Sequence, residues 1–271
     1  MDGPHLPKMP APPQSPSRLP PSQPLRYNAP TMNEPKDRLI VALDYSDLAP
    51  ALAMADVIGA GVGMLKVGLE LFNSAGPQAI AALRERRARI FYDCKFSDIP
   101  NTVAGASAAA ARMGVTMFNV HTLGGIKMMA AAREATHRAA EEAGQAPPLV
   151  IGVTIVTSLS DREVQRDLGI PETASEAAVR LAILAKEAGL DGVVASVHEV
   201  PQIKRTCGRE FLTVTPGIRP AWAAVGDQAR FATPGEALAA GADYLVIGRP
   251  ITRADDPAQA LADVLREMGG R

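Results

Sequence analysis

The chain has 271 residues, a formal net charge of −1 at pH 7, 47% hydrophobic residues and only 4% aromatic residues. This length suits one large α/β domain or two small ones. The balanced charge gives no reason to expect a nucleic acid or an anionic membrane as a partner.

The two cysteines, Cys94 and Cys207, are too few for a disulfide framework or a cysteine metal cluster. We therefore expect a reducing, cytoplasmic environment. No apolar run in the sequence reaches the length of a membrane span. The N-terminal residues also lack the apolar stretch of a signal peptide.

Residues 1–37 form a leader that is rich in Pro, Ser and Gln. Proline at this density opposes both helix and sheet, and the segment has few residues that could join a core. We expect it to be disordered and the folded domain to span residues 38–271. Two other interpretations of this leader stay open. It could serve as a polyproline ligand for another protein, or, more simply, translation could start at Met32, so that the residues before it would not be made.

From Arg38 onward, short apolar runs rich in β-branched residues alternate with longer Ala-rich stretches of helical period. The predicted strands are 38–43, 63–67, 89–93, 115–120, 149–154, 191–194, 211–215 and 243–247. The predicted helices are 48–60, 75–87, 100–113, 125–143, 173–188, 199–206, 234–240 and 256–268. Eight strand–helix units in this length predict a single-domain α/β fold, the (β/α)8 or TIM barrel. A doubly wound open sheet is the alternative, but no Gly-x-Gly-x-x-Gly follows the first strand.

Polar side chains recur where the predicted strands end. In a (β/α)8 barrel these ends meet at one rim, where the chemistry of such enzymes takes place. The residues at or just past the strand ends are Asp44, Lys66, Asp93, Lys95, His121, Thr157 and Arg249. Grouped charges are costly to desolvate unless they pair, so the cluster indicates either structural ion pairs or a site.

The third strand carries the densest part of this pattern. Asp93 and Lys95 are two residues apart, so on a strand both point to one face, and Cys94 points to the opposite, buried face. Asp98 follows after a short turn. His121 ends the fourth strand, and we interpret it as a packed residue that supports the site from behind.

The loops after strands seven and eight carry a phosphate signal. Gly217 lies in the first loop, and Gly248 and Arg249 lie in the second. These are the loops that commonly bind phosphate in such barrels, where glycine permits close backbone approach and arginine adds a charged fork. Tight turns would explain either glycine alone. The long stretch 218–232 predicts a lid, in which Gln228 could donate to the phosphate; from the residues alone, a solvated glutamine without such a role is the preferred interpretation.

Metal and serine-hydrolase chemistry find no support in the sequence. His5, His137 and His198 are scattered, and no Gly-x-Ser-x-Gly is present. We therefore expect neither a metal nor another cofactor.

The motifs closely resemble the orotidine 5'-phosphate decarboxylase family of the bacterial type. The resemblance extends from Arg38 to the last helix, and its most specific motif is Asp93-x-Lys95-x-x-Asp98-Ile99-Pro100-Asn101-Thr102. Related sugar-phosphate decarboxylases and aldolases share the Asp-x-Lys-x-x-Asp core but lack the Ile-Pro-Asn-Thr continuation. Further matches are Leu43-Asp44, Lys66-Val67-Gly68, Val120-His121, Val156-Thr157-Ser158, the run from Thr215 to Pro220, Gly226-Asp227-Gln228 and the run from Ile247 to Pro250.

The resemblance implies roles for these residues. It implies a charge network of Lys66, Asp93, Lys95 and Asp98, with Asp98 reaching into the site of a second subunit in a homodimer. Its substrate-binding residues would be Asp44 and Lys66 for the ribose, Ile99 and Thr102 across the interface, Thr157 or Ser158 for the pyrimidine, and Pro216, Arg219, Gln228, Gly248 and Arg249 toward the phosphate end.

The implied reaction is cofactor-free loss of CO2 from C6 of orotidine 5'-phosphate, in de novo pyrimidine synthesis. Lys95 would protonate C6, and Asp93 would hold Lys95 charged and oriented. Two alternatives stay open. One is a Mg²⁺-dependent sugar-phosphate decarboxylase or aldolase of the same structural group, and the other is a non-catalytic barrel that binds a phosphate ligand.

Overall fold

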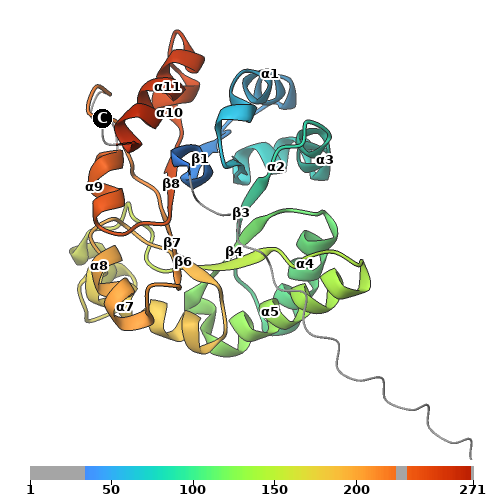
Figure 1. Ribbon diagram of the computed structural model, residues 1–271. Coiled ribbons are helices and arrows are strands. Elements are labelled where there is room, and N and C mark those ends of the chain that lie inside the picture. Colours follow the sequence, from blue (N-terminus) through green and yellow to red (C-terminus); the bar gives the residue numbers. More distant parts are fainter. Residues whose placement is uncertain (1–33, 224–230, 270–271) are drawn as a thin grey trace, which may run out of the picture.

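The computed structural model describes residues 34–223 and 231–269, which form a closed barrel of eight parallel strands surrounded by helices (Figure 1). Each strand pairs with its neighbours in chain order, and β8 returns to pair with β1. The predicted (β/α)8 fold is confirmed, and the open doubly wound sheet is wrong.

All eight predicted strands are present, most of them one or two residues shorter than the apolar runs. Their bounds are β1 Leu39–Ala42, β2 Met64–Val67, β3 Ile90–Phe96, β4 Met117–His121, β5 Leu149–Val153, β6 Gly192–Val194, β7 Leu212–Thr215 and β8 Tyr244–Ile247. Parallel strands covered by helices are buried on both faces, so they are apolar throughout rather than alternating.

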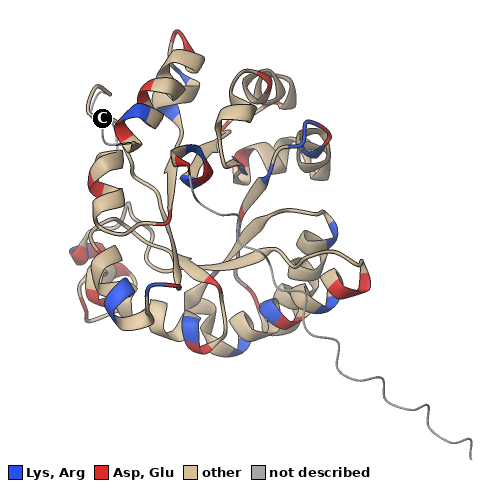
Figure 2. Cartoon of the chain, in the orientation of Figure 1, with Lys and Arg blue, Asp and Glu red and all other residues tan. Residues whose placement is uncertain are grey.

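The eight predicted helices form the outer layer. They are α1 Leu48–Ile58, α3 Pro77–Glu85, α4 Pro100–Arg112, α5 Gly125–Glu142, α7 Ala174–Glu187, α8 Val200–Cys207, α9 Pro234–Ala239 and α11 Pro257–Met268. Charged residues of both signs are spread around this ring (Figure 2). Capping boxes begin α7 at Thr173 and α9 at Thr233, where a glutamate three residues later completes the motif.

Short helices in the loops were not predicted. They are α2 Leu69–Ala75, α6 Asp161–Asp167 and α10 Arg249–Thr252, with the 3-10 turns η1 Pro35–Arg38, η2 Gly59–Gly61 and η3 Thr122–Gly124. The predicted helix 75–87 begins at Pro77 instead, because Gly76 takes a left-handed φ of 64° that separates α2 from α3. The η1 turn places residues 35–37, assigned to the leader, directly before β1; residues 1–33 lie outside the described part.

Two apolar layers follow from strand alternation. Leu39 and Val41 of β1 point outward and pack with the helices, whereas Ile40 points into the barrel. The barrel interior is filled by side chains from seven of the strands: Ile40, Met64, Phe91, Met117, Leu149, Ile151, Val214 and Tyr244. This plug fills the barrel below the carboxyl ends of the strands. Among the described helices, none is long and apolar enough to cross a membrane.

Strand β3 departs from the prediction in length and in regularity. It extends to Phe96 rather than ending at residue 93. Its register against β4 shifts, since Tyr92 pairs with Phe118 and Phe96 pairs with Val120. Asp93, Cys94 and Lys95 therefore face one β4 residue, and Lys95 has a left-handed φ of 51°. Asp93 and Lys95 still share the pocket face and Cys94 the buried outer face, as predicted, but a bulge rather than regular strand alternation places them there.

The opposite, amino-terminal end of the barrel is closed by a repeated polar contact. The contact occurs at three places, just before β4, β6 and β8. There, the side chain of the residue before the strand accepts a hydrogen bond from a backbone N–H near the start of the preceding strand, which is β3, β5 or β7. Thr116 accepts from Ile90, Asp191 accepts from Val150, and Asp243 accepts from Thr213. Each contact satisfies a buried donor that the parallel ladder leaves without a partner.

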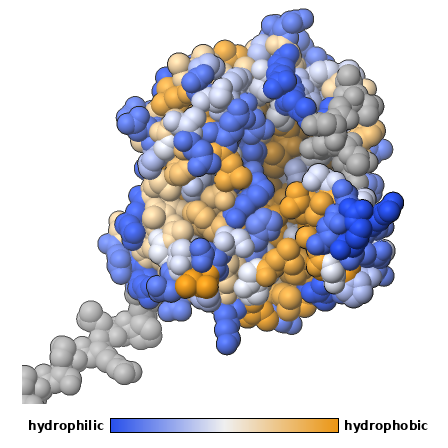
Figure 3. Space-filling model, turned by 180° about the vertical axis from the view of Figure 1, so that it is seen from behind, coloured by the Kyte–Doolittle hydropathy of each residue, from blue (hydrophilic) through white to orange (hydrophobic). Residues whose placement is uncertain are grey.

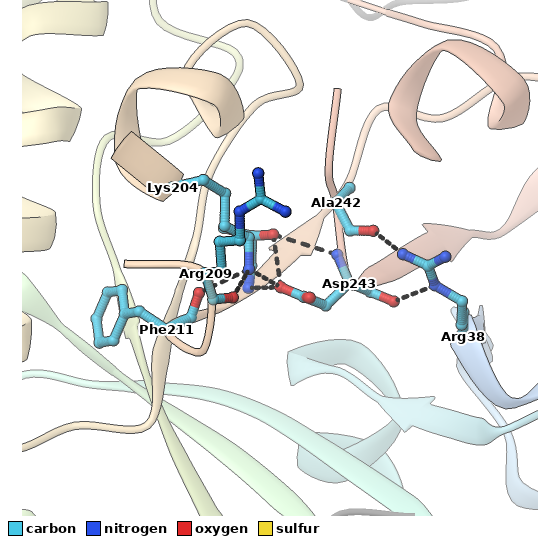
Figure 4. Close-up of polar contacts among 7 residues, drawn as sticks. Arg38, Lys204, Arg209, Phe211, Ala242 and Asp243 are labelled. Atoms are coloured by element: carbon cyan, nitrogen blue, oxygen red, sulfur yellow. Dashed lines mark hydrogen bonds and ion pairs between the residues drawn. The ribbon is translucent and has the colours of Figure 1, made fainter. Parts of the chain in front are cut away.

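Asp243 is the centre of the most extensive of these contacts (Figure 4). Its carboxylate accepts from Thr213 N at 2.6 Å and from the ammonium group of Lys204, on α8, at 2.6 Å. Lys204 also donates to the carbonyl groups of Arg209 and Phe211. Arg38 donates to the carbonyl groups of Ala242 and Asp243. The cluster ties α8 and the segment before β1 to the β7–β8 pair.

Replacing Asp243 by alanine is expected to lower the free energy of unfolding by about 3 kcal/mol, because it leaves the largely buried Lys204 ammonium group without its counter-ion. For a domain of this size that corresponds to a fall in Tm of roughly 10 °C. Calorimetry or thermal circular dichroism measures it. Asp167→Ala removes the exposed pair with Arg166 and should shift Tm by no more than about 2 °C. Equal effects of the two substitutions would contradict the role given to the cluster.

Candidate active site

A pocket of about 280 Å³ opens at the carboxyl ends of the strands. Its floor is apolar and includes Ala42, Phe91, Val153, Val214 and Val246, so the interior plug of the barrel is also the base of the pocket. From the side opposite to Figure 1, the surface shows a hollow with hydrophobic residues inside it and hydrophilic residues along its edge (Figure 3).

Four side chains of alternating charge form a row on one wall of the pocket. The ammonium nitrogen of Lys66, at the end of β2, lies 3.1 Å from a carboxylate oxygen of Asp44 and 3.1 Å from one of Asp93. The other Asp93 oxygen lies 2.6 Å from the ammonium nitrogen of Lys95. The predicted juxtaposition of Lys66, Asp93 and Lys95 is present, and Asp44 extends it.

The two central groups of this row, Lys66 and Asp93, are held ionised by their neighbours. Burial alone would raise the pKa of Asp93, but Lys66 and Lys95 outweigh it and lower that pKa below its ordinary value. Burial likewise opposes the charge of Lys66, yet Asp93 and Asp44 raise the pKa of its ammonium group. At neutral pH, Lys66 and Asp93 therefore present fixed charges beside the pocket.

The absence of a side chain at Gly68 leaves room for the charged groups of Lys66 and Asp44. A Cβ atom at this position would lie 2.9 Å from the Lys66 ammonium nitrogen and 3.4 Å from Asp44. Any other residue would push against the charged groups. Close packing rather than backbone conformation therefore favours glycine here, since its φ of −91° is open to any residue and a side chain would displace the Lys66 ammonium group.

The opposite side of the rim comes from the loops after β7 and β8. Pro216, Gly217, Arg219, Gly248 and Arg249 all line the pocket. Gly217 has a left-handed φ of 78°, which favours glycine. Backbone hydrogen bonds from Arg219 N to Ala232 O and from Ala232 N to Gly217 O join the two ends of the long loop. Gln228, predicted within this loop, lies outside the described residues.

The loop after β5 supplies Thr157, which lines the pocket, while its neighbour Ser158 is exposed. His121 lies partly buried at the end of β4. Burial, and then the charge of Lys95, lower the pKa of His121, so its imidazole is neutral at pH 7. These positions agree with a neutral polar group above the apolar floor and a histidine placed behind the charged row.

The family model for orotidine 5'-phosphate decarboxylase / HUMPS matches residues 37–264. The chain belongs to this family. A curated orotidine 5'-phosphate decarboxylase of Alkalilimnicola ehrlichii is 53% identical over 234 residues, which cover 86% of this chain and 97% of that protein. The enzyme of the same name from Moorella thermoacetica is 50% identical over 233 residues, covering 86% and 92%.

A solved structure gives the same result. The crystal structure of orotidine 5'-phosphate decarboxylase from Lactobacillus acidophilus has a TM-score of 0.75 and 37% sequence identity to this chain. The match covers 85% of this chain and 98% of that one. The family membership indicated by the Asp93 to Thr102 motif is therefore confirmed.

Three residues of the family motif lie away from the pocket of their own chain. Asp98, Ile99 and Thr102 are exposed at the start of α4, and the Ile99 side chain is 67% accessible. The Asp98 carboxylate accepts a hydrogen bond from Ile99 N at 2.6 Å. The charged row within the described residues thus consists of Asp44, Lys66, Asp93 and Lys95, without Asp98.

Asn119 of β4 is a polar contact of the charged row that sequence analysis missed. Its side-chain amide donates to Asp93 at 2.7 Å, and its side-chain oxygen accepts from Lys95 N at 2.7 Å. An asparagine in the run Met117-Phe118-Asn119-Val120, which is otherwise apolar, was the available signal. A buried polar residue on a barrel strand must find partners, and those nearest are the charges of β3.

Proposed function

We propose that this member of the family is a carboxy-lyase that converts orotidine 5'-phosphate to uridine 5'-monophosphate and CO2 without a cofactor, within pyrimidine biosynthesis. The observation that carries the proposal is the ion pair of Lys95 and Asp93 at 2.6 Å, within a charged row above an apolar floor. The names of relatives that share about half of its residues support the same reaction.

The chemistry calls for such a row. Loss of CO2 from C6 leaves an electron pair in an sp2 orbital that the pyrimidine ring cannot delocalise. Placed charges are the strongest means of stabilising it, since they need no reorganisation during the reaction. Lys95 supplies a cation beside C6 and then the proton that completes the product. Asp93 lies against the departing carboxylate and keeps Lys95 in place, while Lys66 balances the charge of Asp93.

The pocket has a place for each part of the substrate. The phosphate binds between the loops after β7 and β8, at Gly217, Gly248 and Arg249, with Arg219 and Pro216 beside it. The ribose hydroxyl groups bind Asp44, which follows β1, and Lys66 of β2, between the phosphate and β3. Thr157 meets the edge of the pyrimidine. The apolar floor lies under the ring and lowers the local dielectric, which strengthens the fixed charges.

A homodimer completes this scheme. Exposed apolar side chains follow each of β2, β3 and β4: Leu69 at the start of α2, Ile99 before α4, and Leu123 and Ile126 at η3 and the start of α5. Exposed apolar residues of this kind are typical of a protein interface. In the dimer, Asp98, Ile99 and Thr102 of one subunit reach the pocket of the other, which explains why they leave their own pocket.

The direct test is the fall in absorbance of orotidine 5'-phosphate with purified protein, with and without EDTA. We expect turnover that EDTA leaves unchanged. Activity lost with EDTA would favour the Mg²⁺-dependent sugar-phosphate decarboxylase or aldolase. Ligand binding without turnover would favour the non-catalytic barrel.

Arg249→Ala is expected to weaken the binding of uridine 5'-monophosphate by about 2–4 kcal/mol, because it removes a charged contact to the phosphate in a site shielded from water. Isothermal titration calorimetry measures the Kd. Arg253→Ala is a matched control, since Arg253 is exposed at the end of α10 and lies outside the pocket lining. Unchanged affinity in Arg249→Ala would place the phosphate elsewhere.

A further inference from the structure

Asn119 holds two groups of the charged row with one side chain. The amide nitrogen donates to the same Asp93 oxygen that accepts from the Lys95 ammonium group. The amide oxygen accepts from the backbone N–H of Lys95. The main-chain carbonyl of Asn119 accepts from the Cys94 thiol at 3.2 Å. All three residues of the β3 bulge are thus in contact with Asn119, which is fully buried.

The bulge explains why these contacts are needed. Between the pairs Tyr92–Phe118 and Phe96–Val120, β3 has three residues where β4 has one. A regular ladder cannot satisfy the Lys95 N–H at that point, and Lys95 is held in a left-handed conformation. The Asn119 side chain replaces the missing ladder partner. As a result Asp93 and Lys95 both line the pocket, while Cys94 is buried on the outer side of the barrel.

Only a side chain with a donor and an acceptor fits both contacts. A backbone N–H can only donate, and an ionised carboxylate can only accept, so the orientation of the Asn119 amide is fixed by its partners. Leucine has a similar size and offers neither group. Aspartate keeps the acceptor for Lys95 but places a second negative charge against Asp93.

We infer that Asn119 is a positioning residue for the decarboxylation, which fixes the β3 bulge so that the Asp93 carboxylate and the Lys95 ammonium group meet the substrate together. The inference rests on the proposed function for its kinetic consequence. Asn119 does not line the pocket within the described part of the chain, so it acts through Asp93 and Lys95. Through Asn119, β4 thus contributes to the placement of Asp93 and Lys95, whereas the sequence motif indicates β3 alone.

Asn119→Leu is the first test. We expect kcat for orotidine 5'-phosphate to fall about 100-fold, since misplacing a reacting group by about 1 Å costs that much. The Kd for uridine 5'-monophosphate should stay within threefold, because the phosphate and ribose contacts come from other strands. Thr122→Val is the matched control. It removes another buried hydrogen bond, from Thr122 to Val153 O at 2.8 Å, and should leave kcat unchanged.

A readout independent of turnover is hydrogen exchange of the Lys95 amide. It should be protected in the wild type and in Asn119→Asp, and should exchange faster in Asn119→Leu. A wild type without decarboxylase activity would overturn the proposed function but leave this exchange test standing. A kcat for Asn119→Leu within threefold of the wild type, in an active protein, would overturn the positioning role alone.

Asn119→Asp provides a second variant if the leucine protein fails to fold. Protonated aspartic acid can donate to Asp93, so kcat relative to the wild type should rise at least threefold as pH falls from 8 to 6. The groups facing this position are Asp93, Lys95, Lys66 and the Cys94 thiol, whose pKa burial raises to about 12, with Asp44 beyond Lys66 and His121 at the end of β4. Dividing the kcat of the variant by the kcat of the wild type at each pH cancels the titration of these neighbouring groups. A flat ratio across this range would contradict the need for a donor at Asn119.

Discussion

Lys95→Ala is expected to reduce decarboxylation of orotidine 5'-phosphate by on the order of 10⁴-fold or more. The substitution removes the proton donor and the cation nearest the reacting carbon, and each of these is worth roughly 10²-fold or more. The fold should survive, because Asp93 keeps its contacts with Lys66 and Asn119. Single-turnover assays with purified variant, alongside circular dichroism, measure both effects.

Two controls sharpen this test. Lys186→Ala removes an exposed lysine at the end of α7, on the outer layer, and should leave activity unchanged. Lys95→Arg keeps a cation but cannot give up its proton at neutral pH, so it should also be nearly inactive. Activity of Lys95→Ala within a few-fold of the wild type would rule out the proposed role of Lys95.

Mixing the inactive variants Lys95→Ala and Asp98→Ala is expected to restore activity. If Asp98 serves the site of the neighbouring subunit, a heterodimer has one site with both defects and one with neither. Random reassociation makes half of all dimers heterodimers, so the mixture should reach about a quarter of wild-type sites. Exchange is achieved by unfolding and refolding the two chains together, followed by the absorbance assay.

Refolding each variant alone is the control for this experiment and should yield no activity. A mixture of Lys95→Ala with Lys66→Ala, whose side chains lie in the same pocket, should also stay inactive, because neither site of that heterodimer is whole. Recovery in the second mixture, or none in the first, would contradict a site shared between subunits.

The sequence predicted the barrel well because its signal is local. Each strand is a short apolar run, and each covering helix is a longer stretch with helical period, so the eight units could be counted directly. The short helices α2, α6 and α10 were missed because four to seven residues show little periodicity. Gly76 shows the same limit, since its left-handed φ delays the start of the predicted helix 75–87 to Pro77 and separates it from the unpredicted α2.

The charged row was predictable for a different reason. Asp44, Lys66 and the pair Asp93 and Lys95 lie near the carboxyl ends of three successive strands, and a closed barrel brings such ends to one rim. The bulge in β3 and the contacts of Asn119 were not predictable in this way. They depend on the register between β3 and β4, which join residues about 26 positions apart and which no local pattern reports.

The left-handed backbone at Lys95 places catalysis and stability in opposition at one residue. A side chain in that conformation costs on the order of 1 kcal/mol, which glycine avoids. Lys95→Gly should therefore be at least as stable as Lys95→Ala, the reverse of the usual order within a strand. The cation that the proposed reaction needs thus stands at a position where the backbone alone would favour glycine.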